Sequence, residues 1–178
     1  SGCTCSYSLR TTVVLKHKPT KGDAEWAVFI SQAASKPVSH LAVNFGAPGD
    51  MRAQDGTVWF GYPRPKTTVG QGAFRNYGIK FDLAEAGVPE VIQRDWRGRT
   101  FAGTDKPWLF TSALKGATRF TVPLLKKGEK GRYTVRLGFT PLTGDRAGSR
   151  VFDIKLQCKT VLTKLDVTKA AGGMARVT

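Results

Sequence analysis

The chain has 178 residues, 40% of them hydrophobic, which is enough for one domain with its own core and argues against a disordered segment. No apolar stretch approaches the roughly 20 residues of a membrane helix, so no membrane span is expected. Lysine and arginine number 28 against 13 acidic residues, a formal net charge of +15. This excess favours polyanions as partners, such as an acidic polymer, nucleic acid, anionic lipid or an acidic protein.

Short stretches in which apolar and polar residues alternate follow one another along the chain, and each predicts a β-strand. They cover residues 11–15, 24–30, 41–45, 58–62, 79–83, 119–124, 133–139 and 152–156. Only residues 82–86 and 112–115 favour short helices. The pattern is typical of an all-β protein, a β-sandwich or jelly roll. Residues 1–20 are expected to form an N-terminal strand or arm, and residues 21–178 the domain.

Residues 43–65, VNFGAPGDMRAQDGTVWFGYPRP, contain four glycines and three prolines, which exclude a helix. The stretch instead predicts strand, loop, strand and turn. Val58, Phe60 and Tyr62 are expected on one face of the second strand, with Trp59 on the other. The pattern leaves open whether the loop serves the fold or a ligand.

Sequence motifs of catalysis are missing: there is no G-x-S-x-G, H-E-x-x-H or phosphate-binding glycine loop. The two histidines, His17 and His40, lack an acid in sequence that would orient them, and such a histidine is a poor catalyst. Acidic residues in loops between strands are ordinary turn formers. The chain is therefore predicted not to be an enzyme. Two carboxylate pairs are the candidates for acid–base chemistry, Asp50 with Asp55 and Asp145 with Asp153, and turn formation is the alternative for each.

A metal site is not expected either, because the histidines and cysteines have no zinc-binding spacing. Asp50 and Asp55 could help to hold a structural calcium ion, although the EF-hand pattern is missing. No other cofactor is predicted.

Three cysteines are candidates for disulfide bonds, Cys3, Cys5 and Cys158. Cys3 and Cys5 are two residues apart and would form a strained bond with each other. One of them could pair with Cys158, which leaves a third thiol free or bound to another chain.

Several aromatic residues near turns are candidates for a sugar-binding site. Aromatic rings stack on the apolar faces of sugar rings, while nearby Asp, Asn and Arg side chains bond the hydroxyls. Aromatic residues also favour strands and pack cores, so a structural role is the alternative for each of them. Full burial is awkward for Trp96, which lies between Arg94, Asp95 and Arg97. The candidates are Tyr62, Tyr77 and Trp96, with the basic residue Arg64.

The C-terminal sequence resembles a known family. Residues 133–173, YTVRLGFTPLTGDRAGSRVFDIKLQCKTVLTKLDVTKAAGG, are similar to the C-terminal part of a malectin-like domain, with its R-V-F-D-I hairpin and its D-x-x-x-x-A-G-G segment. Residues 3–15 and 43–65 also resemble the region around such a domain attached to quinoprotein-like β-propellers in secreted bacterial proteins. Where the family usually has Gly at the hairpin turn, this chain has Cys158.

The resemblance implies a galactose-binding-like jelly roll that binds oligosaccharides without catalysis, in a secreted protein that is extracellular or periplasmic. It also implies that Asp166 accepts hydrogen bonds from sugar hydroxyls. Family members continue beyond the A-A-G-G segment into closing strands, so the jelly roll is predicted to lack its final strand or strands.

An alternative to the sugar-binding function follows from the missing strands: the chain could belong to an extracellular assembly in which chains exchange strands. Another chain or domain would then complete the sheet. Carbohydrate is the first predicted partner, and an acidic polymer is compatible with the charge. Nucleic acid ranks last, because no zinc-finger, helix-turn-helix or RNP-like motif is present.

Overall fold

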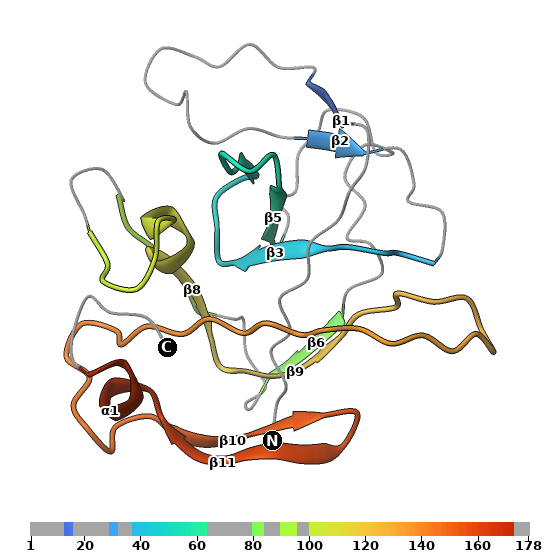
Figure 1. Cartoon of the computed structure of the whole chain (residues 1–178). Helices are drawn as coiled ribbons and strands as arrows, with labels where there is room; N and C mark the ends of the chain where they lie inside the picture. The colour runs from blue at the N-terminus through green and yellow to red at the C-terminus, as the bar shows by residue number, and fades with distance from the viewer. Residues whose placement is uncertain are drawn as a thin grey trace. The chain divides into compact units, whose positions relative to one another are not determined.

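The structure is a computed structural model that describes residues 13–15, 29–31, 37–63, 80–83, 90–95 and 100–172. The described residues fall into two compact units. One holds the described residues within 81–120 and 136–172, and the other holds the described residues from 13 to 80 together with residues 121–135. Both units consist of short strands in small sheets (Figure 1), so the prediction of an all-β protein is confirmed. Among the described residues, no helix is both long and apolar enough to cross a membrane.

In the unit that holds Thr121–Val135, the main sheet has three strands in the order β3-β5-β4. β3 (Ala42–Phe45) runs parallel to β5 (Val58–Tyr62), and β4 (Met51–Arg52) pairs with β5 in antiparallel fashion. The same unit contains β1 (Val13–Leu15), paired with β2 (Phe29–Ser31). Buried apolar side chains of this unit come mainly from β3, β5 and the residue before β3; they include Leu41, Ala42, Val43, Val58 and Phe60.

The strand-loop-strand prediction for residues 43–65 is confirmed up to Pro63, where the described residues stop. Val58, Phe60 and Tyr62 are buried at 4%, 2% and 5% exposure, while Trp59 is half-buried, as period-two alternation predicts. Two parallel strands cannot be joined by a tight hairpin, so the chain needs a crossover between β3 and β5. Residues 46–57 supply it and add β4 to the far edge of the same sheet.

The loop at the start of this crossover packs directly on β5 at Gly61. A Cβ atom on Gly61 would clash with the backbone oxygen of Gly49 and lie 3.0 Å from that of Ala47. The Gly61 N–H donates to the carboxylate of the fully buried Asp50 at 2.9 Å. Residues 46–50 therefore serve the fold, because they cover a strand at a position where only glycine fits.

Among its described residues, the other unit contains three strand pairs. They are β6 (Lys80–Leu83) with β9 (Ala117–Thr121), β7 (Glu90–Gln93) with β8 (Ser112–Lys115), and β10 (Val151–Leu156) with β11 (Lys159–Asp166). A 3₁₀ helix, η1 (Pro107–Phe110), precedes β8, and the short helix α1 (Val167–Ala171) directly follows β11 (Figure 1). Buried apolar side chains of this unit include Trp108, Phe120, Ile154, Val167 and Ala171.

The β10–β11 hairpin closes through a two-residue turn, since Leu156 pairs with Lys159. Gln157 and Cys158 form the turn with φ angles of 49° and 66°. Two central residues with positive φ are the mark of a type I′ turn, which glycine adopts most easily. The prediction that Cys158 occupies a hairpin position normally suited to glycine is therefore confirmed.

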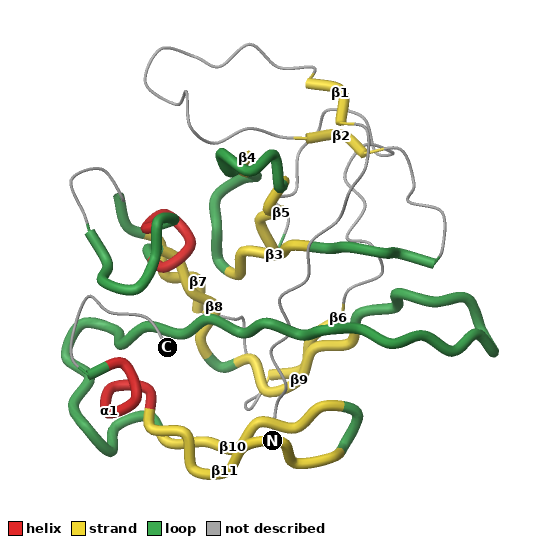
Figure 2. The backbone as a smooth tube through the Cα atoms, in the orientation of Figure 1, coloured by secondary structure: helices red, strands yellow, loops and turns green. Residues whose placement is uncertain are grey.

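Three predictions from periodicity were wrong. Residues 112–115 form strand β8 and not a helix, and of the predicted helix 82–86 the described residues Asp82 and Leu83 belong to strand β6. Residues 133–139 form no strand: Figure 2 draws residues 122–150 as loop throughout. The burial of 133–139 does alternate, however, with Tyr133, Val135, Leu137 and Phe139 half-buried. This segment is extended and has the expected alternation, but it has no continuous ladder with a partner strand.

Candidate functional site

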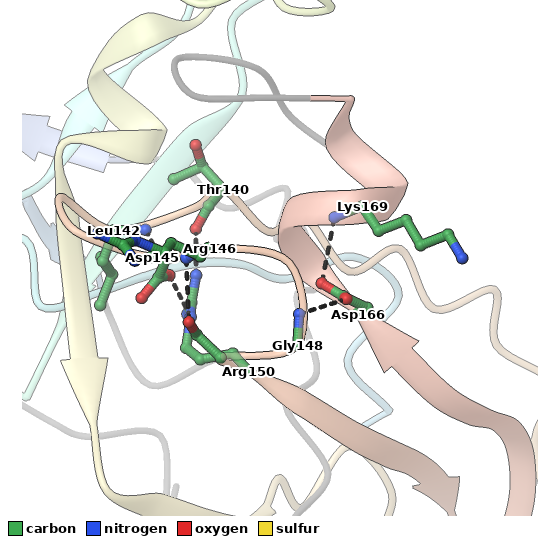
Figure 3. Close-up of polar contacts among 9 residues, drawn as sticks. Thr140, Leu142, Asp145, Arg146, Gly148, Arg150, Asp166 and Lys169 are labelled. Atoms are coloured by element: carbon green, nitrogen blue, oxygen red, sulfur yellow. Dashed lines mark hydrogen bonds and ion pairs between the residues drawn. The ribbon is translucent and has the colours of Figure 1, made fainter.

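The candidate site is the polar cluster where the loop before β10 meets the start of α1 (Figure 3). Two consecutive turns build the loop, residues 142–145 and 146–149. Gly144 and Gly148 have φ angles of 90° and 85°, which side chains with a Cβ rarely adopt. In each turn the last side chain accepts the first residue's N–H. Asp145 Oδ2 accepts from Leu142 at 2.8 Å, and Ser149 Oγ accepts from Arg146 at 3.0 Å.

Arg150 fixes this loop from its C-terminal end. Its Nε donates to Asp145 Oδ2 at 2.6 Å, and Nη2 donates to the carbonyl of Thr140 at 2.7 Å (Figure 3). The Arg150 side chain is 31% exposed and that of Asp145 15%, so the pair is partly shielded from water. A planar guanidinium with several donors can hold two acceptors at once, which a lysine ammonium does less well. The Arg150–Asp145 pair therefore sets the path of the loop.

Asp166 is the last residue of β11 and the N-cap of α1. Its Oδ1 accepts the N–H of Lys169 at 3.1 Å, and Oδ2 accepts the N–H of Gly148 at 2.7 Å (Figure 3). The α1 helix ends at Gly172, whose φ is 72°. An acid at the N-cap and a glycine after the last turn are the usual limits of a short helix.

These contacts also set the charge of Asp166. The hydrogen bonds from Lys169 and then from Gly148 hold the pKa of its carboxyl below the ordinary value. The group is therefore an anion at neutral pH. An ionised carboxylate has about four lone-pair directions, and the backbone N–H groups of Lys169, Gly148 and Thr168 occupy at most three of them. Asp166 thus keeps acceptor capacity beyond its structural role, and its side chain is only half-buried.

Tyr62 is buried in the structure. It is 5% exposed and its ring meets that of Phe45 edge-on, with the centroids 6.0 Å apart. Burial raises the pKa of its hydroxyl above the usual value. Stacking on a sugar needs an open ring face, so the observed environment of Tyr62 is that of a core residue. Its part in ligand binding stays a prediction.

Other predicted residues lie outside the described part of the chain. These are Tyr77, Trp96, Arg64, His17, Cys3 and Cys5. Of the three disulfide candidates, only Cys158 is described, and its thiol is free and exposed at the tip of the β10–β11 hairpin. His40, the described histidine, is also exposed.

The acidic residues that are candidates for calcium binding or catalysis in the sequence accept backbone hydrogen bonds in the structure. Asp55 accepts the N–H of Thr57 at 2.9 Å, and Asp50 accepts that of Gly61. Asp153 accepts the N–H of Lys164 at 2.8 Å, while Asp145 pairs with Arg150. Within the described residues no three His, Cys, Asp or Glu side chains gather in a way that could hold a metal ion.

Sequence analysis did not find the Arg150–Asp145 pair, although it lies inside the segment that carries the family resemblance. The available signal was the sequence T-G-D-R-A-G-S-R, residues 143–150, in which Gly-Asp and Gly-Ser each favour a turn. Two successive turns bring residues 145 and 150 together, whereas their spacing in the sequence alone does not.

Comparison with known proteins identifies the family. A family model described as the Malectin domain matches residues 39–178, which is most of the chain. No curated protein and no solved structure gave a match. Malectin domains are non-catalytic carbohydrate-binding domains, and the small β-sheets of this chain are consistent with their β-sandwich fold. The chain belongs to the malectin family.

Proposed function

We propose that this chain is a carbohydrate-binding module that binds an oligo- or polysaccharide and leaves it chemically unchanged. The observation that carries the proposal is the match of residues 39–178 to the Malectin domain. Association with a β-propeller and a secreted or periplasmic location, both suggested by the sequence resemblance, are part of the same proposal.

Asp166 is the residue through which we expect hydroxyl recognition. A sugar hydroxyl needs an acceptor held in a fixed direction, and hydrogen bonds to an ionised acceptor are the stronger ones. The lowered pKa keeps the Asp166 carboxyl ionised, and the bonds from Gly148 and Lys169 fix its orientation. These properties support the proposed role.

A glycan array tests the proposal, with the purified chain applied at low and at high salt. Binding to a neutral oligosaccharide should survive high salt, because no charge on the ligand is screened. Asp166→Asn should weaken it, whereas the matched variant Asp153→Asn should not. Asp153 is also a carboxylate of the β10–β11 hairpin that accepts one backbone N–H. Failure of the chain to bind any neutral glycan would contradict the proposed function.

The alternative function, strand exchange between chains, finds less support in β11. β10 has six residues and β11 eight, and the register shifts twice between them, so β11 carries two extra residues as bulges. One bulge lies near Lys164, whose φ is 50°. Bulges interrupt the row of backbone groups that a second chain would need for pairing. We therefore rank assembly by strand exchange below carbohydrate binding.

A further inference from the structure

A second surface of the chain is rich in unpaired positive charge. We call it the basic loop: residues 126–132, K-K-G-E-K-G-R, with the four cations Lys126, Lys127, Lys130 and Arg132. All four side chains are exposed. Among the described residues, none of them forms an ion pair with a carboxylate. Short segments with this density of Lys and Arg are typical of surfaces that bind polyanions.

The basic loop has a defined shape. The N–H of Glu129 donates to the carbonyl of Lys126 at 3.1 Å, and Glu129 Oε2 accepts the N–H of Lys126 at 2.9 Å. Gly128, with a φ of 88°, allows this tight turn. The single acid of the loop is thus engaged by the backbone, where it neutralises none of the four cations directly.

The base of the basic loop is anchored in its own unit. Leu124 is buried, and its carbonyl accepts the N–H of Val38 at 2.8 Å. On the other side of the turn, Gly131 lies close to the side chains of Leu125 and Tyr133. An anchored loop presents its charges in a limited volume, so a bound polyanion meets several of them at once.

The composition of the loop distinguishes between classes of polyanion. Single-stranded nucleic acid is usually held by exposed aromatic rings, but the aromatic residue nearest to the loop in the sequence, Tyr133, is half-buried and lies close to Gly131. Large apolar side chains beside the charges strengthen binding to a lipid surface by inserting below the headgroups, and the segment 126–132 has none. A linear glycan with repeated sulfate or carboxylate groups needs neither feature.

We propose that the basic loop binds a linear anionic polysaccharide through the sulfate or carboxylate groups of the polymer. This surface contains none of the residues assigned above to hydroxyl recognition. The proposal therefore stands apart from the neutral-sugar function, and the two can fail separately.

The test compares three forms of the full chain. The first is the wild type, and the second replaces the four cations of the basic loop: Lys126→Gln, Lys127→Gln, Lys130→Gln and Arg132→Gln. The third is a matched control that removes the same charge elsewhere, from three lysines and one arginine: Lys155→Gln, Lys159→Gln, Lys164→Gln and Arg146→Gln. Affinities are measured for heparin, polygalacturonate, a neutral glucan and duplex DNA, at about 50 mM and about 200 mM salt.

We expect the wild type to bind heparin or polygalacturonate, and the basic-loop variant to bind it at least about tenfold more weakly, because four exposed ion pairs each contribute modestly. The affinity of the control variant should stay within about twofold of that of the wild type, because salt screens charges that lie far from the bound polymer. The variant should also show a smaller dependence on salt, since fewer counterions are released. Heparin contains both sulfate and carboxylate groups, so binding of heparin without polygalacturonate would show that carboxylates alone do not suffice. Binding of polygalacturonate without heparin would show that the loop selects the carboxylate polymer over a sulfated one.

Four outcomes would overturn the proposal: no binding of either anionic glycan by the wild type, equal affinity in the basic-loop variant, an equal loss in the control, or tighter binding of DNA than of both glycans. An equal loss in the control would mean that net charge alone is responsible. If the fourfold variant does not fold, Lys127→Glu alone, compared with Lys159→Glu, gives the same contrast. Binding of neutral glucan by all three forms would bear only on the other proposal.

Discussion

The carboxylate of Asp166 accepts the N–H of Gly148 at 2.7 Å and so joins two segments separated by 18 residues. One segment is the turn 146–149, and the other is the junction of β11 and α1. The Val167 N–H, which donates to the Arg150 carbonyl at 3.3 Å, lies beside this link. A single side chain thus caps a helix and fixes a loop. Only the choice of substitution can separate this structural role from the proposed role in ligand binding.

Asp166→Ala should lower the melting temperature by a few degrees, because it removes the N-cap of α1 and the acceptor of Gly148 together. Asp166→Asn should cost less, since asparagine is as good an N-cap as aspartate, but its single oxygen cannot replace both carboxylate oxygens that accept from Lys169 and Gly148. Thermal unfolding followed by circular dichroism at neutral pH measures both. Equal melting temperatures for wild type and Asp166→Ala would contradict the capping role.

The stability conferred by Asp166 should depend on pH. Hydrogen bonds from Lys169 and Gly148 lower the pKa of this carboxyl in the folded chain, so folding favours the charged form. The contribution of this carboxylate to stability is therefore complete above its pKa in the unfolded chain, about 4, and is lost as the pH falls through its pKa in the folded chain. We therefore expect the melting temperature of the wild type to fall relative to that of Asp166→Asn as the pH is lowered from about 6 to about 3. A difference that stays constant over this range would show that the charge makes no contribution.

The sequence predicted the strands well where a strand has one buried face and a partner. Val58, Phe60 and Tyr62 are the clearest case, because period-two alternation there coincides with pairing to both β3 and β4. The same alternation in residues 133–139 predicted a strand that does not form. Alternating burial indicates only that the chain is extended with one side chain in two facing inward. Phe139, for example, packs on Phe152 with ring centroids 5.4 Å apart. A strand also needs a partner backbone, which local periodicity does not encode.

For the candidate site, the sequence supplied one residue and missed its surroundings. Asp166 was found through the family resemblance, although Asp before V-T-K-A-A and Gly172 after it are themselves helix limits. The contacts of Asp166 with Gly148 and of Arg150 with Thr140 span 18 and 10 residues. They depend on two glycine-containing turns in succession, and no propensity of single residues specifies that geometry.

Gly61→Ala should destabilise the fold strongly, by about 3 kcal/mol, the upper end for overpacking. A Cβ at this position meets backbone atoms: it would clash with Gly49 O and lie 2.9 Å from Gly49 C. Gly138→Ala is the matched control, because the added Cβ would meet ring atoms of Phe110 at 3.0 and 3.1 Å, and a side chain can turn away. Urea unfolding measures both variants. If Gly61→Ala lowers the free energy of unfolding less than Gly138→Ala does, the loop 46–50 must move to make room for the added Cβ.

Arg150→Lys should lower the free energy of unfolding by about 1–3 kcal/mol, the range for hydrogen bonds to charged groups. Lysine keeps the charge but cannot reach Asp145 Oδ2 and the Thr140 carbonyl with the same fork of donors. Arg146→Lys is the control: this exposed arginine takes part in its turn through the backbone. The urea unfolding curves of Arg150→Lys and Arg146→Lys should differ. Coincident curves would show that the two hydrogen bonds of the Arg150 guanidinium do not contribute to stability.

Cys158→Gly should raise the free energy of unfolding by about 1 kcal/mol, because a residue with a Cβ is strained in the left-handed conformation by about that amount. Cys158 has a φ of 66° in the turn of the β10–β11 hairpin. Removing the thiol could itself change stability, so Cys158→Ala serves as the control that retains the Cβ. We expect the glycine variant to be more stable than the alanine variant and the wild type, as measured by urea unfolding under reducing conditions. If alanine and glycine have the same effect, the thiol rather than the backbone limits stability at this turn. If the glycine variant is less stable than the wild type, the side chain of Cys158 makes a favourable contribution that outweighs the strain.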